Sequence, residues 1–166
     1  MDQINTFNLK LLSHSALQTF RSCPRKYELD RLQPDKKEAS TIHTAFGSAL
    51  GAGIQKILET HSLNDGILTA FKEWDIPLYE ESPKASKSFP FAILGLTNFY
   101  NEILGQFDEW ELAYIKDGKP ACELSFAIKL PLDYYYRGFL DAVLKHKQTG
   151  KYRVLELKTT GSKFVD

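Results

Sequence analysis

The sequence predicts an α/β fold, with helices in the first two-thirds of the chain and strands in the last third. Apolar residues recur at helical spacing up to about residue 108, and from Trp110 onward they alternate with polar residues, as strands require. The chain has 166 residues, about the length of one domain. We therefore expect a single domain over residues 1–166, with a helical part at about 1–108 and a sheet part at about 109–166.

The helices are marked by capping residues and by the spacing of apolar side chains. Ser15 is a suitable N-cap for a first helix that runs to about Cys23, where Pro24 interrupts it before a further turn or two. The other segments of this part are assigned by periodicity and composition: helices at residues 41–60, 63–74 and 89–107, and proline-containing polar loops at residues 33–40 and 76–87.

Three glycines stand out in the helix expected over residues 41–60. Gly47, Gly51 and Gly53 each cost about 1 kcal/mol relative to alanine inside a helix. Either another backbone or a ligand comes close to this helix, or the glycines only allow tight packing between helices. The sequence favours the two explanations equally.

The sheet part is built from short alternating segments joined by turns. Asp117-Gly118 and Gln148-Thr149-Gly150 are turn sequences. The expected strands lie at residues 111–116, 122–129 and 134–145, followed by a last strand at residues 154–158.

Two of these strands carry acidic residues near a lysine. Glu156 and Lys158 share one face of the last strand, and Asp141 lies on the strand before it. Charged groups at a buried strand end are costly without a partner or a task. Two carboxylates that hold a divalent metal beside a lysine suit the hydrolysis of phosphodiesters. The alternative is that Glu156 and Lys158 form an ordinary solvated ion pair.

Composition adds few restrictions on function. Lysine plus arginine and aspartate plus glutamate both number 21, so no overall charge marks a protein that coats DNA. No apolar run is long enough to cross a membrane, and the first residues lack the pattern of a signal peptide. Cys23 and Cys122 form no CxxC pair, so a reducing cytoplasm is the expected location.

Four segments together resemble the RecB-like and phage exonuclease branch of the PD-(D/E)XK nuclease superfamily. Ser15 to Tyr27 is similar to its opening "S-x-L-x-x-F/Y-x-x-C-P-x-x-F/Y" signature, and Phe46-Gly47 to the start of its first catalytic helix. Arg137 to Asp141 resembles its "G-x-x-D" strand, and Leu155 to Thr160 its "D/E-x-K-T" strand. Their order and spacing match those of the family.

The resemblance implies a restriction-endonuclease-like mixed sheet flanked by helices. In the family a helix and a strand often follow the lysine strand, and a "Q-x-x-x-Y" helix there contacts DNA. This sequence ends eight residues after Lys158. We therefore expect either that the chain is truncated at its C-terminus, with the last helix and strand missing from it, or that another chain completes the domain.

The resemblance also assigns roles at the site. It implies that Asp141 and Glu156 bind Mg²⁺ or Mn²⁺ together with the backbone carbonyl of Leu157, since such ions prefer oxygen ligands. Lys158 would orient or deprotonate the attacking water, or stabilise charge on the phosphate. Thr159-Thr160 would bind a DNA phosphate, although strand propensity explains these two threonines equally well.

The chain departs from the family pattern at one ligand. A histidine usually follows the helix glycine by four residues, and here that position is Gly51. Gln55 is one turn further along the same helix face and is the first candidate to replace it, with Glu59 second. Glu123 either reaches the site from a neighbouring strand or points to solvent. His43 precedes the glycine and is expected to be structural or exposed.

An iron–sulfur cluster is not expected from this chain alone. Some family members hold one with a cysteine at the "C-P" position, which Cys23 matches, and three more near the C-terminus. Those three are absent here, and a cluster needs four thiolates.

The resulting expectation is a metal-dependent DNA nuclease of phage or bacterial replication, recombination or repair. It would act on DNA beside a helicase or recombination protein, without a membrane. The alternative is a catalytically inactive, nuclease-like module that binds DNA or a protein.

Overall fold

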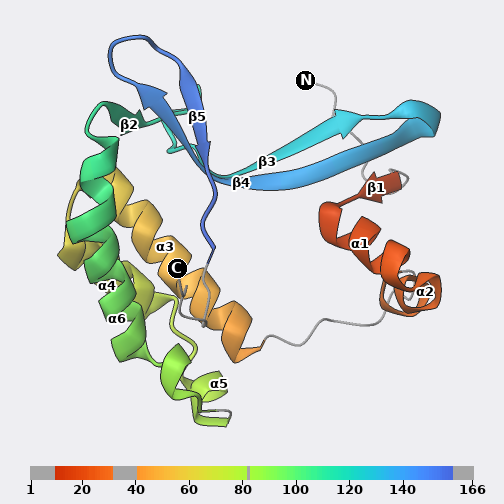
Figure 1. The fold of residues 1–166 in the computed structure, drawn as a ribbon, viewed down its shortest axis with the longest axis horizontal. Coiled ribbons are helices and arrows are strands. Elements are labelled where there is room, and N and C mark those ends of the chain that lie inside the picture. Colours follow the sequence, from red (N-terminus) through yellow and green to blue (C-terminus); the bar gives the residue numbers. More distant parts are fainter. Residues whose placement is uncertain (1–9, 32–40, 82, 159–166) are drawn as a thin grey trace, which may run out of the picture. The chain divides into compact units, whose positions relative to one another are not determined.

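The structure is a computed structural model that describes residues 10–31, 41–81 and 83–158. Within those ranges the chain forms six α-helices and a mixed five-stranded sheet, which confirms the predicted α/β fold (Figure 1). In chain order the elements are β1 (Lys10–Leu12), α1 (His14–Ser22), α2 (Pro24–Arg31), α3 (Ile42–Thr60), α4 (Leu63–Lys72), α5 (Ile76–Glu81), α6 (Phe89–Asn98), β2 (Trp110–Leu112), β3 (Cys122–Lys129), β4 (Tyr134–His146) and β5 (Tyr152–Leu155).

The chain divides into two compact units. The first consists of Met1–Glu38 and Leu124–Leu140, and the second of Ala39–Glu123 and Asp141–Asp166. In the first unit β1 runs parallel to the start of β4, with Leu11 opposite Tyr135. The other partner of β4 in this unit is β3, and the ring of Phe126 on β3 lies against Gly138 on β4. A Cβ at Gly138 would lie 2.7 Å from Cζ of Phe126.

In the second unit the end of β4 is the central strand. It pairs antiparallel with β2, where Leu112 is opposite Leu144, and antiparallel with β5, where Ala142 is opposite Leu155. Because side chains alternate along a strand, the buried Ala142 and Leu144 share the face of β4 that packs on the helices.

The core of the second unit lies between α3, α4 and α6 and this face of β4. Its largest fully buried side chains are Ile57, Leu96 and Leu144. Thr41 caps α3 with a capping box, in which its hydroxyl accepts from the N–H of Thr44. The α3 helix therefore starts and ends where the sequence predicts.

The helical segment that begins with α6 changes its hydrogen bonding along its length. After α6, residues Phe99–Ile103 form a π-helical turn, in which the N–H of Leu104 donates to the carbonyl of Phe99. Leu104–Phe107 then form a short 3₁₀ helix. The predicted helix over residues 89–107 thus exists as one helical segment with three different hydrogen-bond patterns.

Several element boundaries differ from the prediction. The polar stretch after α4 contains α5 and a 3₁₀ turn at Ala85–Lys87, where a loop was expected. The N-cap of α1 is Ser13, whose hydroxyl accepts from the N–H of Ala16, and not Ser15. The last strand, β5, ends at Leu155, so Glu156 and Lys158 follow the strand and do not lie on it. The short strand β1 was not predicted.

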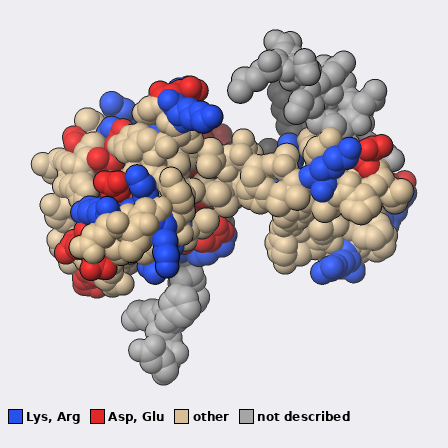
Figure 2. All heavy atoms as spheres, turned by 90° about the horizontal axis from the view of Figure 1, so that it is seen from above, with Lys and Arg blue, Asp and Glu red and all other residues tan. Residues whose placement is uncertain are grey.

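The surface is mixed in charge, as the composition predicts. Figure 2 shows positive and negative side chains interspersed on the face that it presents. Among the described residues, no helix is both long enough and apolar enough to cross a membrane. The loop expected at residues 33–40, together with Thr159 and Thr160, lies outside the described residues.

Candidate active site

A main-chain hydrogen bond places Asp141 against the segment that follows β5. The N–H of Leu157 donates to Oδ2 of Asp141 at 2.6 Å, and this contact is partly buried. Hydrogen bonds to an ionised carboxylate are stronger than those between neutral groups. The bond therefore joins the two parts of the sequence motif, β4 and residues 156–158, although they are not paired as strands at this point.

Gln55 connects α3 to the same place. Its Nε2 donates to Oε1 of Glu123 at 3.1 Å and to the main-chain carbonyl of Asp141 at 3.3 Å. Its neighbour Ile54 is buried, and this fixes the rotation of α3 so that Gln55 reaches the strands. Gln55 therefore lies beside both acidic residues.

Glu123 reaches the site through an unusual backbone conformation. Its φ is 48°, in the left-handed region that residues other than glycine rarely adopt and that costs about 1–3 kcal/mol. Just before it, the carbonyl of Ala121 accepts from the N–H of Val143 at 2.9 Å, which fixes the start of β3 beside the end of β4. Such strain is concentrated at functional sites in many proteins.

The residue before Glu123 is a half-buried thiol, Cys122. Burial raises the pKa of Cys122 to about 11, and the negative charges of Glu59 and Glu123 contribute to the rise. Cys122 is therefore a neutral thiol at physiological pH, and its role is packing. Cys23 is a free, exposed cysteine at the end of α1.

A cavity of about 320 Å³, here named the acidic cavity, is formed by these residues. One wall is the α3 face with Gly51 and Gln55, and the opposite wall carries Glu123, Asp141 and Leu157. A Cβ built on Gly51 meets no described atom within 4 Å, so this position faces open space. The helix therefore leaves room at the point where the resemblance expects a histidine.

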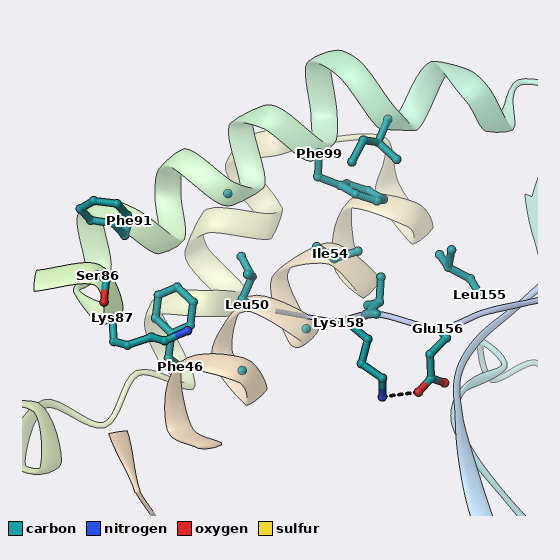
Figure 3. Close-up of a pocket in the computed structure, with 15 residues that line it drawn as sticks. Phe46, Leu50, Ile54, Ser86, Lys87, Phe91, Phe99, Leu155, Glu156 and Lys158 are labelled. Carbon is teal, nitrogen blue, oxygen red and sulfur yellow. Dashed lines mark hydrogen bonds and ion pairs between the residues drawn. The ribbon is translucent and has the colours of Figure 1, made fainter. Parts of the chain in front are cut away.

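Glu156 and Lys158 lie beside the acidic cavity and pair with each other. Nζ of Lys158 donates to Oε1 of Glu156, and both side chains are largely exposed (Figure 3). The hydrogen bond and the negative charge of Glu156 raise the pKa of Lys158, and Asp141 adds a smaller contribution. These two residues line a second, larger cavity, and Leu157 lines both.

The donors of the acidic cavity suit a hard divalent cation. Glu123 and Asp141 supply carboxylate oxygens, and Gln55 supplies an amide oxygen when its amide is turned by 180°. Within the described ranges, no three His, Cys, Asp or Glu side chains form a metal-binding group. Two carboxylates and an amide thus fit Mg²⁺ with several retained waters, which is the usual manner of binding for this ion.

The structure brings together most of the predicted site residues that it describes. Asp141, Gln55 and Leu157 line one cavity, with Glu156 and Lys158 next to it. The weaker candidate Glu59 lies elsewhere and pairs with Lys56 at 2.7 Å. His43, which was not expected at the site, has its Nε2 3.2 Å from Nζ of Lys84. The predicted phosphate ligands Thr159 and Thr160 lie outside the described residues.

One buried charge was missed from the sequence. Lys87 is only 6% exposed and lies in the larger cavity with Lys158. Its neighbours in the sequence, Ser86 and Ser88, give no sign of burial. Only the packing of the 3₁₀ turn against α3 shows where Lys87 lies.

Comparison with known families identifies the chain. The family model of the PD-(D/E)XK nuclease superfamily matches residues 11–166. No curated protein and no solved structure matched the chain. Members of the superfamily are typically nucleases that act on DNA with divalent metals such as Mg²⁺. With nearly its whole length matched, this chain belongs to the PD-(D/E)XK nuclease superfamily.

Proposed function

We propose that the chain is a Mg²⁺- or Mn²⁺-dependent deoxyribonuclease of the RecB-like branch, which hydrolyses phosphodiester bonds in phage or bacterial replication, recombination or repair. The observation that carries the proposal is the hydrogen bond from Leu157 to Asp141. It joins the "G-x-x-D" strand to the "E-x-K" segment at the mouth of a cavity lined by oxygen donors.

In this proposal the acidic cavity holds the metal. Asp141, Glu156 and the carbonyl of Leu157 are the family ligands, and Gln55 replaces the histidine that Gly51 lacks. Glu123 adds a second carboxylate inside the cavity. When bound, the cation lowers the pKa of its water and offsets charge on the phosphate.

Lys158 then acts on the phosphodiester. Its ammonium group donates to a phosphate oxygen or to the attacking water, and to do so it must leave Glu156. Glu156 is 51% exposed and is free to turn toward the acidic cavity when that pair opens. Thr159 and Thr160 are proposed to bind a neighbouring phosphate.

The finer assignment to the RecB-like branch rests on the sequence motifs. The opening signature falls on α1 and α2, and Phe46-Gly47 lies in the first half of α3. RecB-like nucleases often work beside a helicase, so we propose a helicase or recombination protein as partner and a cytoplasmic location. We also propose that the two compact units belong to one nuclease domain.

A catalytically inactive, DNA- or protein-binding module is the second candidate. Two observations favour it. Gly51 offers no side chain at the usual histidine position, and Glu156 forms an ion pair with Lys158 and does not line the acidic cavity. Both observations concern catalysis, and neither weakens the binding of DNA.

A cleavage assay separates the two candidates. The chain is incubated with linear single-stranded, linear double-stranded and circular DNA in Mn²⁺, in Mg²⁺ or in EDTA. We expect metal-dependent cleavage that falls at least about 100-fold in Asp141→Asn and in Lys158→Met, because each change removes a charge from the reaction centre.

Matched variants control for loss of charge alone. Asp117→Asn and Lys151→Met make the same changes at exposed positions outside the site, and they should cleave as the wild type does. DNA binding without cleavage in any metal would support the inactive module. Equal cleavage by Asp141→Asn and Asp117→Asn would reject the proposed site.

A further inference from the structure

The proposed cleavage reaction assigns no ligand to the larger of the two cavities. It measures about 620 Å³, within the range of about 300–1,000 Å³ of small-molecule pockets. It lies between α3, the segment that starts with α6, and residues 155–158 (Figure 3). We name it the aromatic cavity, after Phe46, Phe91 and Phe99 in its walls.

Lys87 is the most informative residue of this cavity. Its Nζ lies 4.6 Å from the centre of the Phe46 ring, and the residue is 6% exposed. Over the described part of the chain no carboxylate forms an ion pair with it. The ammonium group lines the cavity beside an aromatic ring, so it is placed to bind an anion that enters the cavity.

The three phenylalanine rings of the cavity differ in their exposure. Phe46 and Phe99 are 6% and 4% exposed, so they belong to the core. Phe91 is 50% exposed and still lines the cavity, which leaves its ring accessible to a ligand (Figure 3). An accessible ring next to a buried cation suits a planar aromatic group that carries a negative charge.

The charges of the cavity also favour an anion. Lys87 and Lys158 are positive, and the one carboxylate among the lining residues, Glu156, is already paired with Lys158. The acidic cavity adjoins it through Leu157 and Gly51, which line both. A ligand here would therefore lie next to the proposed reaction centre.

We propose that the aromatic cavity binds one unstacked nucleotide of single-stranded DNA, with its base on Phe91 and its phosphate at Lys87. The inference rests on the proposed function and names its substrate class. Bases in a duplex are stacked on their neighbours and cannot enter a cavity, whereas bases of a single strand stack on aromatic side chains at little cost. The enzyme would thus engage DNA that is single-stranded next to the cleaved bond.

Binding measured without metal tests this independently of cleavage. The probes are fluorescent dT10 and a decamer of abasic sites with the same phosphates, in EDTA. We expect wild-type protein to bind dT10 about tenfold more tightly than the abasic strand, and Phe91→Ala to remove that difference. Phe20→Ala, which removes an equally exposed ring from α1, should keep it.

The salt dependence of binding tests the phosphate contact. Lys87→Met should weaken both probes about tenfold and reduce the slope of log K against log salt by about 0.7, the value for one phosphate of a single strand. Methionine fills the space of lysine without a charge, so the fold should persist, and thermal melting checks this. Lys84→Met makes the same change at an exposed neighbour and should leave the slope unchanged.

The outcomes separate this inference from the proposed function. Equal effects of Lys87→Met and Lys84→Met, or a Phe91→Ala protein that still prefers dT10, would overturn the nucleotide site even if the enzyme cleaves DNA. Tight competition by thymidine monophosphate would assign the cavity to free nucleotides and would also overturn the inference. Wild-type protein that binds dT10 as predicted but never cleaves DNA would keep the site and reject the nuclease.

Discussion

Among single residues, Glu156 has two possible partners in the proposed mechanism. The structure pairs it with Lys158, and its hydrogen bond and charge raise the pKa of that lysine above the ordinary value of 10.5. Holding the metal would take Glu156 away from Lys158.

A substitution at Glu156 should be visible in the titration of Lys158. In Glu156→Gln we expect the pKa of Lys158 to fall toward its ordinary value, as measured by NMR of the lysine side chain. Glu80→Gln, an exposed change on α5, should leave that pKa unchanged. An unchanged Lys158 pKa in Glu156→Gln would contradict the pairing.

The sign of the linked stability follows from the raised pKa. The pair stabilises the fold below the unfolded-state pKa of Lys158, and the contribution disappears as the pH rises through the higher folded-state value. Lys158 is 80% exposed, so the effect on the free energy of unfolding is small.

At the scale of elements, the structure shows a different environment for each of two glycines in α3. A Cβ at Gly53 would lie 2.8 Å from Cδ2 of Leu96 on α6 and 3.0 Å from the carbonyl oxygen of Gly66 on α4, so this glycine serves close helix packing. Gly51, two residues earlier, faces open space and both cavities. Each of the two explanations therefore holds for a different glycine.

The two glycines should respond in opposite ways to alanine. Gly53→Ala should lower the free energy of unfolding by about 1–3 kcal/mol, because the backbone of α4 cannot move away cheaply. Gly51→Ala should raise it by about 0.5–1 kcal/mol, since alanine is the better helix former and nothing obstructs its methyl group. Urea denaturation measures both, and a loss of stability in both variants would show that the space at Gly51 is not available.

The elements also show where sequence patterns were sufficient. The capping residue Thr41 and a long apolar stripe predicted α3 correctly, and strict alternation gave β3 its observed ends at Cys122 and Lys129. The short α5 has a capping residue, Asp75, whose Oδ1 accepts from the N–H of Leu78 at 3.0 Å, but its six residues carry no apolar stripe that would distinguish it from a polar loop with proline. The strand β1 is defined by its pairing with distant residues of β4, and a local pattern does not report such pairing.

The site was predictable to the extent that its chemistry is local in sequence. Asp141, Glu156 and Lys158 were predicted from spacing and from the resemblance to the family, and Gln55 from its place one helical turn after Gly51; the structure places all four around two adjoining cavities. The contribution of Glu123 depends on a left-handed backbone at φ 48°, which alternation along a strand does not predict. Lys87 depends on the packing of a 3₁₀ turn against α3, and no periodicity reports such packing.

At the scale of the whole molecule, metal binding should be linked to stability. A ligand that binds only the folded protein stabilises it by about 1.4 kcal/mol at ten times its dissociation constant. We expect Mn²⁺ or Mg²⁺ to raise the melting temperature of the wild type, and Ca²⁺ or EDTA controls to show whether the effect requires a small divalent ion.

The metal-induced rise in melting temperature should also show whether the metal binds in the acidic cavity. Asp141→Asn should lose most of the metal-induced rise, whereas Asp117→Asn should keep it. If both variants respond like the wild type, the metal binds somewhere other than the cavity of Gln55, Glu123 and Asp141.

The π-helical turn at Phe99–Ile103 has a consequence for how this protein tolerates changes in length. Such a turn accommodates one residue more than an α-helical turn does, while the helix before and after it keeps its contacts. An insertion or deletion elsewhere in α6 would rotate every later side chain around the helix axis. Within this turn, the loss of one residue would be absorbed as an ordinary α-helical turn, so homologues that differ in length along this helix should differ here.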